Sequence, residues 1–367
     1  MDVKKYNLPV GAVLTVLLWA VLTVLLWFAP RQTLSEAERR PLAQMPPVTA
    51  DSLLDGSFME KFEDFSLDQF PLRNAFRTLK SLFHYGILGQ KDNNAIYIAD
   101  GFAVKQEYPL NPGSIDHAAD RFSYLSEKYL TDARVYFALV PDKGQYLAEK
   151  SGHLTLSYRE MDALLREKLP WATHIDLLDS LDHEAYYRTD THWRQEGLLP
   201  AAKTICEAMG IAAPEETDYE IKTLERPFYG VYYGQAALPM EPETMAYLES
   251  EVLKNCTVYD YESGKTGAVY DMTKLESRDL YDIFLSGARS LLTIENPAGK
   301  EGKELIVFRD SFGSSMVPLL VQEYAKVTLV DIRYIQIDVL DRFLEFGNQD
   351  VLFLYSTLVM NNSETIK

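Results

Sequence analysis

Two short stretches hold residue types that can do chemistry together. The stretch TDTHW places Asp190 and His192 two residues apart in a loop, and RDSFG places Ser311 at a tight turn after an apolar strand. A serine hydroxyl attacks an ester only when a base removes its proton. Histidine is the usual base near neutral pH, and a carboxylate fixes its tautomer. These residues therefore predict serine-dependent acyl chemistry, with Ser311 as nucleophile, His192 as base and Asp190 as the group that orients the base.

Further residues near these stretches are expected to complete the site. The backbone N–H groups from Ser311 to Gly313, including that of Phe312, at the start of the helix expected after the turn, would stabilise an oxyanion. Trp193 is expected to pack over the histidine ring and exclude water. Lys143 and Tyr146 follow another apolar strand and are expected to line the cleft or its rim.

The same residues also have simpler explanations. Ser311 or Ser314 can cap the following helix, and Asp190 or Thr191 can cap the helix after the TDTHW loop. His183 could join the Asp–His pair as a metal ligand, but the sequence has neither HExxH spacing nor a cysteine cluster. We therefore expect no metal and no organic cofactor.

The elements that must position these residues alternate between strand and helix. Continuous apolar strands are expected in ARVYFALVP, KELIVFRD, KVTLVDIRY and DVLFLYST, and helices at 115–129, 157–168, 195–209, 314–324 and 337–346. Such alternation predicts an α/β fold, a mainly parallel sheet with helices on both faces. Chemistry in such folds lies at the carboxyl ends of the strands, which is where the candidate residues fall.

The chain is expected to be tethered by its N-terminus. Residues 10–29 carry no charge, and twenty helical residues span about 30 Å, roughly one bilayer core. We interpret them as an uncleaved transmembrane anchor, with residues 1–9 as a cytoplasmic tail and the remainder outside. Residues 30–56 are polar and contain prolines, which is typical of a stalk. One domain is expected over 57–367, with an insertion or side lobe at about 213–300, where the alternation breaks.

Composition narrows the possible partners. The formal net charge is -18, and an acidic surface repels phosphate backbones, so nucleic-acid binding is not expected. The two cysteines, Cys206 and Cys256, can form one bridge outside the cytoplasm or be two unrelated buried thiols.

Several blocks resemble a known family. These are SEAERRPLAQMP, GSFMEKFEDFSLDQFPLRNAF, YYRTDTHWRQEGLLPAA, YDIFLSGARSLLTIEN and IVFRDSFGSSMVPLLVQEYAKVTLVDIRY, and they look like successive blocks of the DHHW protein family of Gram-positive bacteria. That family is similar to the SGNH-hydrolase-like domains of alginate O-acetyltransferases, which have an Asp-x-His motif early and a serine late. Asp190, His192 and Ser311 match those positions. Thr191 stands where the family has a histidine, and the usual oxyanion glycine and asparagine have no assigned counterpart; Asn296 is one candidate.

The resemblance implies an SGNH-hydrolase-like fold and a function in the cell envelope. It implies a membrane-anchored, extracytoplasmic acetyltransferase or esterase that acts on cell-surface or secreted polysaccharide. It also implies an integral-membrane O-acyltransferase as partner, because cytoplasmic acetyl donors do not reach an outside site unaided. The sequence leaves transfer and hydrolysis open. The alternative is a catalytically inactive polysaccharide-binding or assembly subunit of an O-acetylation complex.

Overall fold

The computed structural model describes residues 10–35 and 37–367, so the expected cytoplasmic tail lies outside the described residues. The chain divides into two compact units, Met1–Gln90 with Ala237–Pro239, and Lys91–Ala236 with Met240–Lys367. This division lies further along the chain than the boundary at 56/57 that the sequence predicts. Residues 57–90 therefore belong to the first unit.

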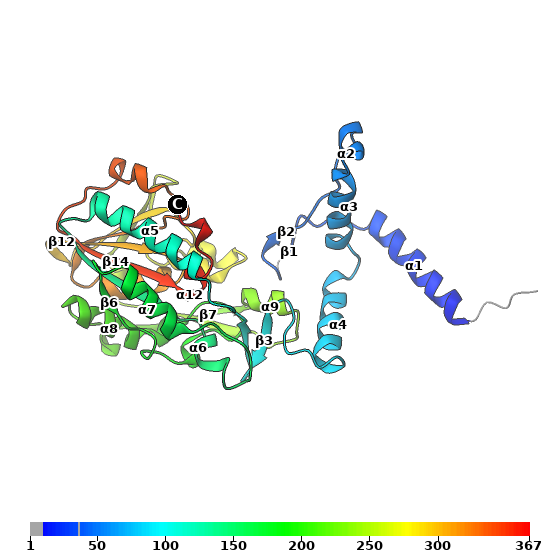
Figure 1. Ribbon diagram of the computed structural model, residues 1–367, viewed down its shortest axis with the longest axis horizontal. Helices are drawn as coiled ribbons and strands as arrows, with labels where there is room; N and C mark the ends of the chain where they lie inside the picture. Colours follow the sequence, from blue (N-terminus) through cyan, green and yellow to red (C-terminus); the bar gives the residue numbers. More distant parts are fainter. Residues whose placement is uncertain (1–9, 36) are drawn as a thin grey trace, which may run out of the picture. The chain divides into compact units, whose positions relative to one another are not determined.

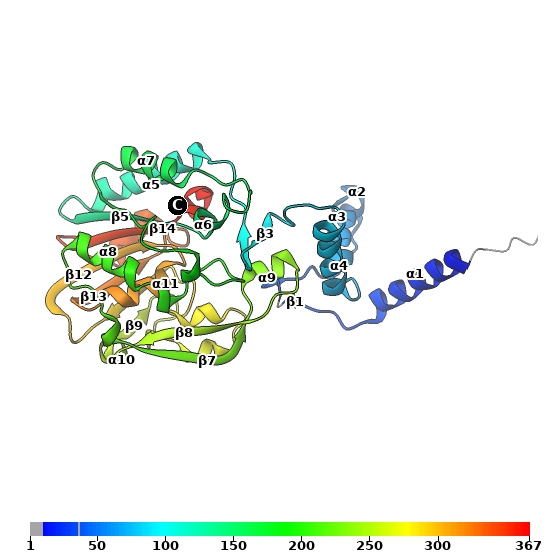
Figure 2. The same cartoon turned by 90° about the horizontal axis from the view of Figure 1, so that it is seen from below.

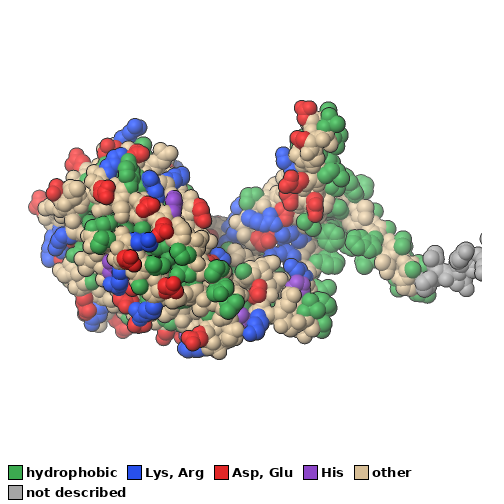
Figure 3. Space-filling model, in the orientation of Figure 1, with side chains coloured by type: hydrophobic (Ala, Val, Ile, Leu, Met, Phe, Trp, Pro, Cys, Tyr) green, Lys and Arg blue, Asp and Glu red, His purple; other side chains and the backbone are tan. Residues whose placement is uncertain are grey.

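The first unit is built from helices and one short strand pair. Its elements are α1 (Val10–Phe28), β1 (Leu34–Ser35), β2 (Arg40–Pro41), α2 (Ala50–Leu54), α3 (Ser57–Asp68) and α4 (Arg73–Gly86). Helix α1 is long and apolar enough to cross a membrane, as a signal sequence would also be, and Leu22 is its one buried residue. Apolar side chains make up much of the face of α1 that is visible in Figure 3.

The segment expected to be a stalk is held by ion pairs inside this unit. Arg40 contacts both carboxylate oxygens of Asp68, at 2.6 and 2.8 Å, and Glu38 pairs with Arg73 and Arg77 of α4. The N–H of Ala43 donates to the same Asp68 carboxylate. Much of the segment after α1 is therefore fixed to α3 and α4 and does not run free.

The second unit contains an eight-stranded sheet (Figure 1). The order is β10-β9-β11-β13-β12-β14-β5-β6, and the five strands from β13 to β6 run parallel to their neighbours. The strands are β5 (Arg134–Val140), β6 (Thr173–Ile175), β9 (Thr257–Asp260), β10 (Lys265–Gly267), β11 (Leu291–Glu295), β12 (Lys300–Arg309), β13 (Tyr324–Val330) and β14 (Asp350–Ser356). The predicted α/β fold with a mainly parallel sheet is confirmed.

Helices cover both faces of the sheet because alternate strand residues point to opposite sides. Phe137 of β5 packs with α5 (Pro112–Tyr129) and α7 (Tyr158–Lys168), whereas Ala138 packs with α8 (Leu199–Met209) and α11 (Gly313–Met316). Figure 2 shows these two helix pairs on opposite sides of β5 and β14. The predicted helix over 314–324 is shorter than expected: Pro318 lies in a 3-10 turn (Val317–Leu320), and the chain re-enters the sheet at Tyr324.

The region expected to be an insertion or side lobe, residues 213–300, is only partly separate from the central sheet. Only its first part forms a separate hairpin, β7 (Glu220–Phe228) with β8 (Glu243–Glu249), which flanks α9 (Val231–Ala236) and is followed by α10 (Glu251–Asn255). Strands β9, β10 and β11 from the same region join the central sheet through antiparallel pairing. Residues 213–300 therefore extend the main sheet as well as standing beside it.

The remaining elements are short. They are the hairpin β3 (Ile96–Ala99) and β4 (Phe102–Lys105), helices α6 (Gly144–Leu147) and α12 (Thr357–Met360), and several 3-10 turns. The predicted helix at 337–346 is one of these turns, Ile337–Arg342. Cys206 and Cys256 are both buried and free, so they form two thiols and no bridge.

Candidate active site

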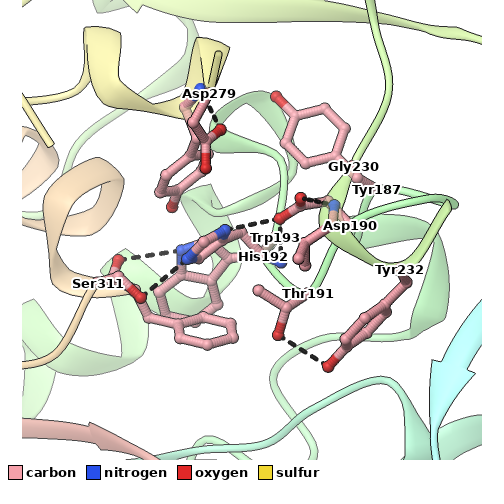
Figure 4. Close-up of polar contacts among 12 residues, drawn as sticks. Tyr187, Asp190, Thr191, His192, Trp193, Gly230, Tyr232, Asp279 and Ser311 are labelled. Atoms are coloured by element: carbon pink, nitrogen blue, oxygen red, sulfur yellow. Dashed lines mark hydrogen bonds and ion pairs between the residues drawn. The ribbon is translucent and has the colours of Figure 1, made fainter. Parts of the chain in front are cut away.

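Two residues of one loop and a serine 119 positions further along the chain form one hydrogen-bonded line (Figure 4). Nδ1 of His192 lies 2.7 Å from Oδ1 of Asp190, and Nε2 of His192 lies 2.8 Å from Oγ of Ser311. The carboxylate only accepts, so Nδ1 carries the proton and Nε2 accepts the serine hydroxyl. In this arrangement a base is placed to take the proton of a nucleophile.

The carboxylate of Asp190 is held by three donors. Oδ1 accepts from the backbone N–H of His192 at 3.0 Å as well as from its ring, and Oδ2 accepts from the N–H of Val231 at 2.8 Å. Asp190 is fully buried. Hydrogen bonds to the charged form favour an ionised carboxylate, which suits a group that must steady an imidazolium.

A second carboxylate fixes the loop that leads to Asp190. Glu243 of β8 accepts from the N–H groups of Arg188 and Thr189, at 2.6 and 2.7 Å, and from the Thr189 hydroxyl. That hydroxyl in turn accepts from the N–H of Gly230. A Cβ on Gly230 would lie 2.2 Å from the carbonyl oxygen of Thr189, so only glycine permits this approach.

The turn that carries Ser311 is shaped by Asp310. Its Oδ1 accepts from the N–H of Phe312 at 3.0 Å, its carbonyl accepts from the N–H of Gly313, and its Oδ2 accepts from the N–H of Ser356 at the end of β14. The N–H groups of Phe312 and Gly313, expected at an oxyanion, are thus used inside the turn. Among the described residues no acceptor takes the N–H of Ser311, which leaves it as the backbone donor beside the nucleophile.

Tyr281, not Trp193, covers the histidine ring. The rings of Tyr281 and His192 are stacked, with centroids 3.9 Å apart and planes 9° apart. Trp193 is fully buried, and its Nε1 donates to the carbonyl of Phe312 and to Oγ of Ser315. Tyr281 lies 2.7 Å from the same Oγ, and burial raises the pKa of its phenol. No spacing in the sequence around Tyr281 singles it out; the contact comes from the tertiary fold alone.

Other expected residues lie elsewhere. Lys143 is buried and does not line an open cleft, because its ammonium points into the protein against backbone carbonyls. The hydroxyl of Tyr146 donates to the carbonyl of Leu178. His183 is placed beside Asp100 and Glu184, away from the Asp–His pair.

Asn296 and Thr191 each have a structural contact. Asn296 shapes a turn by binding the carbonyl of Val321 and the N–H of Ala298, so it is not an oxyanion donor. Thr191, in the place of the family's additional histidine, accepts from the hydroxyl of buried Tyr232 at 3.0 Å. Ser311 is partly exposed, and His192 retains 8% exposure.

Comparisons with known proteins agree with this fold. Residues 172–330 match the family model described as DHHW protein, a span that contains Asp190, His192 and Ser311. No curated protein matches the sequence.

Solved structures extend the likeness over most of the chain. A DHHW family protein from Eubacterium siraeum is 24% identical with a TM-score of 0.60, covering 75% of this chain and 95% of that one. Bacillus cereus PatB1, solved with a sulfonyl adduct, is 19% identical with a TM-score of 0.57, covering 72% and 97%. The O-acetyltransferase domain of Pseudomonas putida AlgJ is 14% identical with a TM-score of 0.45, covering 73% and 92%. The expected DHHW resemblance and SGNH-like fold are confirmed.

Proposed function

We propose that this protein is a serine-dependent acyltransferase or esterase that acts on acetyl esters of a cell-surface or secreted polysaccharide. The observation that carries the proposal is the line from Asp190 through His192 to Ser311, with both hydrogen bonds at 2.7–2.8 Å. The fold alone supports no particular reaction, because one fold serves many functions. The polysaccharide and the acetyl group come from the DHHW resemblance.

In the proposed reaction, Ser311 Oγ bonds to the acyl carbon while Nε2 of His192 takes the hydroxyl proton. The resulting imidazolium is steadied by Asp190, and the N–H of Ser311 donates to the oxyanion. The tetrahedral intermediate then breaks down and expels the donor alcohol, which takes the proton from His192. An acceptor hydroxyl, or water, then attacks the acyl-serine by the reverse sequence and frees Ser311.

We further propose that α1 anchors the chain in the cell membrane with the second unit outside the cytoplasm. The support is an apolar helix of 19 residues with almost all of its surface exposed. An extracytoplasmic site needs an acyl group delivered from the cytoplasm. An integral-membrane O-acyltransferase is therefore the partner proposed.

A second candidate function is a non-catalytic polysaccharide-binding or assembly subunit. The observation that favours it is that Asp310 already occupies the N–H groups of Phe312 and Gly313. The oxyanion would then have few donors, and loss of one such donor costs about 10²–10³ in rate in a serine protease.

The two candidates are separated by treating the full chain, in detergent, with phenylmethylsulfonyl fluoride. A nucleophilic serine displaces fluoride and gains a sulfonyl group, which intact-mass and peptide analysis locate. The catalytic candidate predicts labelling at Ser311 that is lost in His192→Ala and kept in the control Ser180→Ala, whose serine is half-buried and contacts Thr204. Absence of label at Ser311 in the parent favours the binding subunit.

A further inference from the structure

Lys143 stands out as a charged side chain with no place in the reaction above. It follows β5 and begins α6, where a strand end normally presents side chains to a cleft. Here it is 1% exposed. Lysine is almost never buried to this degree unless its charge is paired, so the burial requires an explanation.

The ammonium is satisfied by one loop. Nζ donates to the carbonyls of Tyr187 at 2.6 Å and Asp190 at 2.7 Å, and a longer contact of 3.3 Å reaches the carbonyl of Arg188. The rings of Phe102 and Tyr232 lie 5.7 and 5.3 Å from the same nitrogen. Three N–H donors thus meet three carbonyls of one turn.

The same loop is also bound by the Glu243 carboxylate. Glu243 takes the N–H groups of the loop, and Lys143 takes its carbonyls. One of those carbonyls belongs to Asp190, whose carboxylate binds His192. A movement of this backbone would move the carboxylate relative to the imidazole, and misplacement of about 1 Å can cost about 10² in rate.

We propose that Lys143 is a positioning residue that clamps the 187–190 loop so that Asp190 holds His192 in line with Ser311. The proposal rests on the proposed function for its catalytic consequence. Lys143 is therefore a positioning residue and does not bind substrate at the cleft or its rim, where the sequence analysis expects it.

The clamp depends on pH. Burial lowers the pKa of Lys143 to about 7, against the opposing effect of the carboxylates of Asp190, Glu243 and Asp142. The ring of Tyr232, whose phenol pKa burial raises, faces the ammonium, and the guanidinium of Arg188 lies over the ring of Phe102. A neutral amine has two N–H donors instead of three. The clamp therefore loses one donor as the pH rises through about 7.

The test compares the full chain with Lys143→Met, Lys143→Arg and the control Lys203→Met, whose lysine is exposed on α8. The first readout is the rate of Ser311 labelling by phenylmethylsulfonyl fluoride between pH 6 and 9. The second is amide hydrogen exchange of the peptide spanning 187–192. Circular dichroism reports whether each variant folds.

The proposal predicts at least tenfold slower labelling and faster loop exchange at pH 6.5 in Lys143→Met, with Lys203→Met like the parent. It also predicts that the labelling rate of the parent declines at alkaline pH. This decline is absent in Lys143→Arg, because arginine keeps its charge. Parental labelling and exchange in a folded Lys143→Met overturn the proposal. If that variant fails to fold, an alkaline decline unchanged in Lys143→Arg overturns it.

Failure of the proposed function gives a different result. The parent itself would then not label at Ser311 at any pH. Loop exchange in Lys143→Met would still decide whether Lys143 holds the loop, while its catalytic role would be overturned together with the function.

Discussion

The ring of Tyr281 lies flat on the ring of His192, with centroids 3.9 Å apart, and its hydroxyl lies 2.7 Å from Oγ of Ser315. The tyrosine therefore fixes one face of the imidazole and ties it to the segment just after Ser311. A histidine held in this way cannot turn away from the serine without breaking a stacked pair worth about 0.5–1.5 kcal/mol.

We predict that Tyr281→Ala lowers acetyl-ester turnover about tenfold or more, because the imidazole loses the surface that orients it. Tyr281→Phe keeps the ring and loses one hydrogen bond, about 1 kcal/mol of stability. It should keep most of the activity while lowering the melting temperature. Turnover of 4-nitrophenyl acetate and thermal unfolding check both variants. Equal activity losses in the two would show that the hydroxyl, not the stacked ring, is the important part.

Gly230 offers a test of the loop geometry from outside the triad. A Cβ there would meet the backbone of Thr189 and Asp190 at 2.2–2.3 Å, so Gly230→Ala must push the loop away. We expect a loss of stability of about 1–3 kcal/mol, the range for overpacking, and a fall in turnover of about 10². Gly267→Ala is the matched control, because nothing lies within 4 Å of its added Cβ. Parental activity in Gly230→Ala would contradict the requirement for a fixed loop.

Asp190→Asn tests the role of the buried carboxylate. The amide has nearly the same shape, but its NH₂ group cannot accept from Nδ1 and favours the wrong tautomer of His192. We expect turnover to fall by about 10⁴ with the far-ultraviolet circular dichroism unchanged, the scale seen for the same change in a serine protease. A decrease of less than tenfold would indicate that His192 does not act as a base oriented by Asp190.

The lowered pKa of Lys143 also predicts how global stability depends on pH. The unfolded chain holds the lysine proton up to about pH 10.4, whereas the folded chain releases it at about pH 7. The unfolded state therefore binds more protons between these values, and this residue makes stability rise with pH across that window. Urea unfolding of the parent and of Lys143→Met from pH 7 to 9.5 measures the contribution. The free energy of unfolding of the parent should rise with pH relative to that of Lys143→Met, whose side chain does not titrate. Identical slopes in the two proteins would contradict a lowered pKa for Lys143.

The role of α1 is tested by the mature chain itself. An anchor predicts that the protein stays with the membrane fraction and that its N-terminal peptide is retained. A cleaved signal sequence predicts a soluble chain that begins after α1. N-terminal sequencing of protein from membranes distinguishes the two, and deletion of residues 1–30 should move an anchored protein to the soluble fraction.

The sequence is sufficient to predict the fold and to single out Asp190, His192 and Ser311, because both depend on where apolar strands end. Apolar strands that alternate with helices predict parallel strand ends at one edge, and Ser311 follows such an end directly. Asp190 and His192 are two residues apart in a loop, so their contact is local. That Nε2 of His192 meets Oγ of Ser311 across 119 positions is a property of the tertiary structure.

What sequence could not predict depended on direction and on long-range contacts. Lys143 was placed correctly after β5, but spacing does not determine whether a side chain at a strand end points outward or into the protein. Tyr281 reaches His192 from a 3-10 turn, Leu280–Ile283, in a region without periodic pattern. Strands β9 to β11 pair antiparallel at the sheet edge, where short strands lack the long apolar runs of buried parallel ones.

The most direct measurement of the central claim is acetyl-ester turnover by the full chain in detergent beside Ser311→Ala, His192→Ala and Ser180→Ala. We predict turnover in the parent and in Ser180→Ala, with losses of at least two to three orders of magnitude in Ser311→Ala and His192→Ala. Turnover in Ser311→Ala equal to that of the parent would contradict a serine nucleophile at this position.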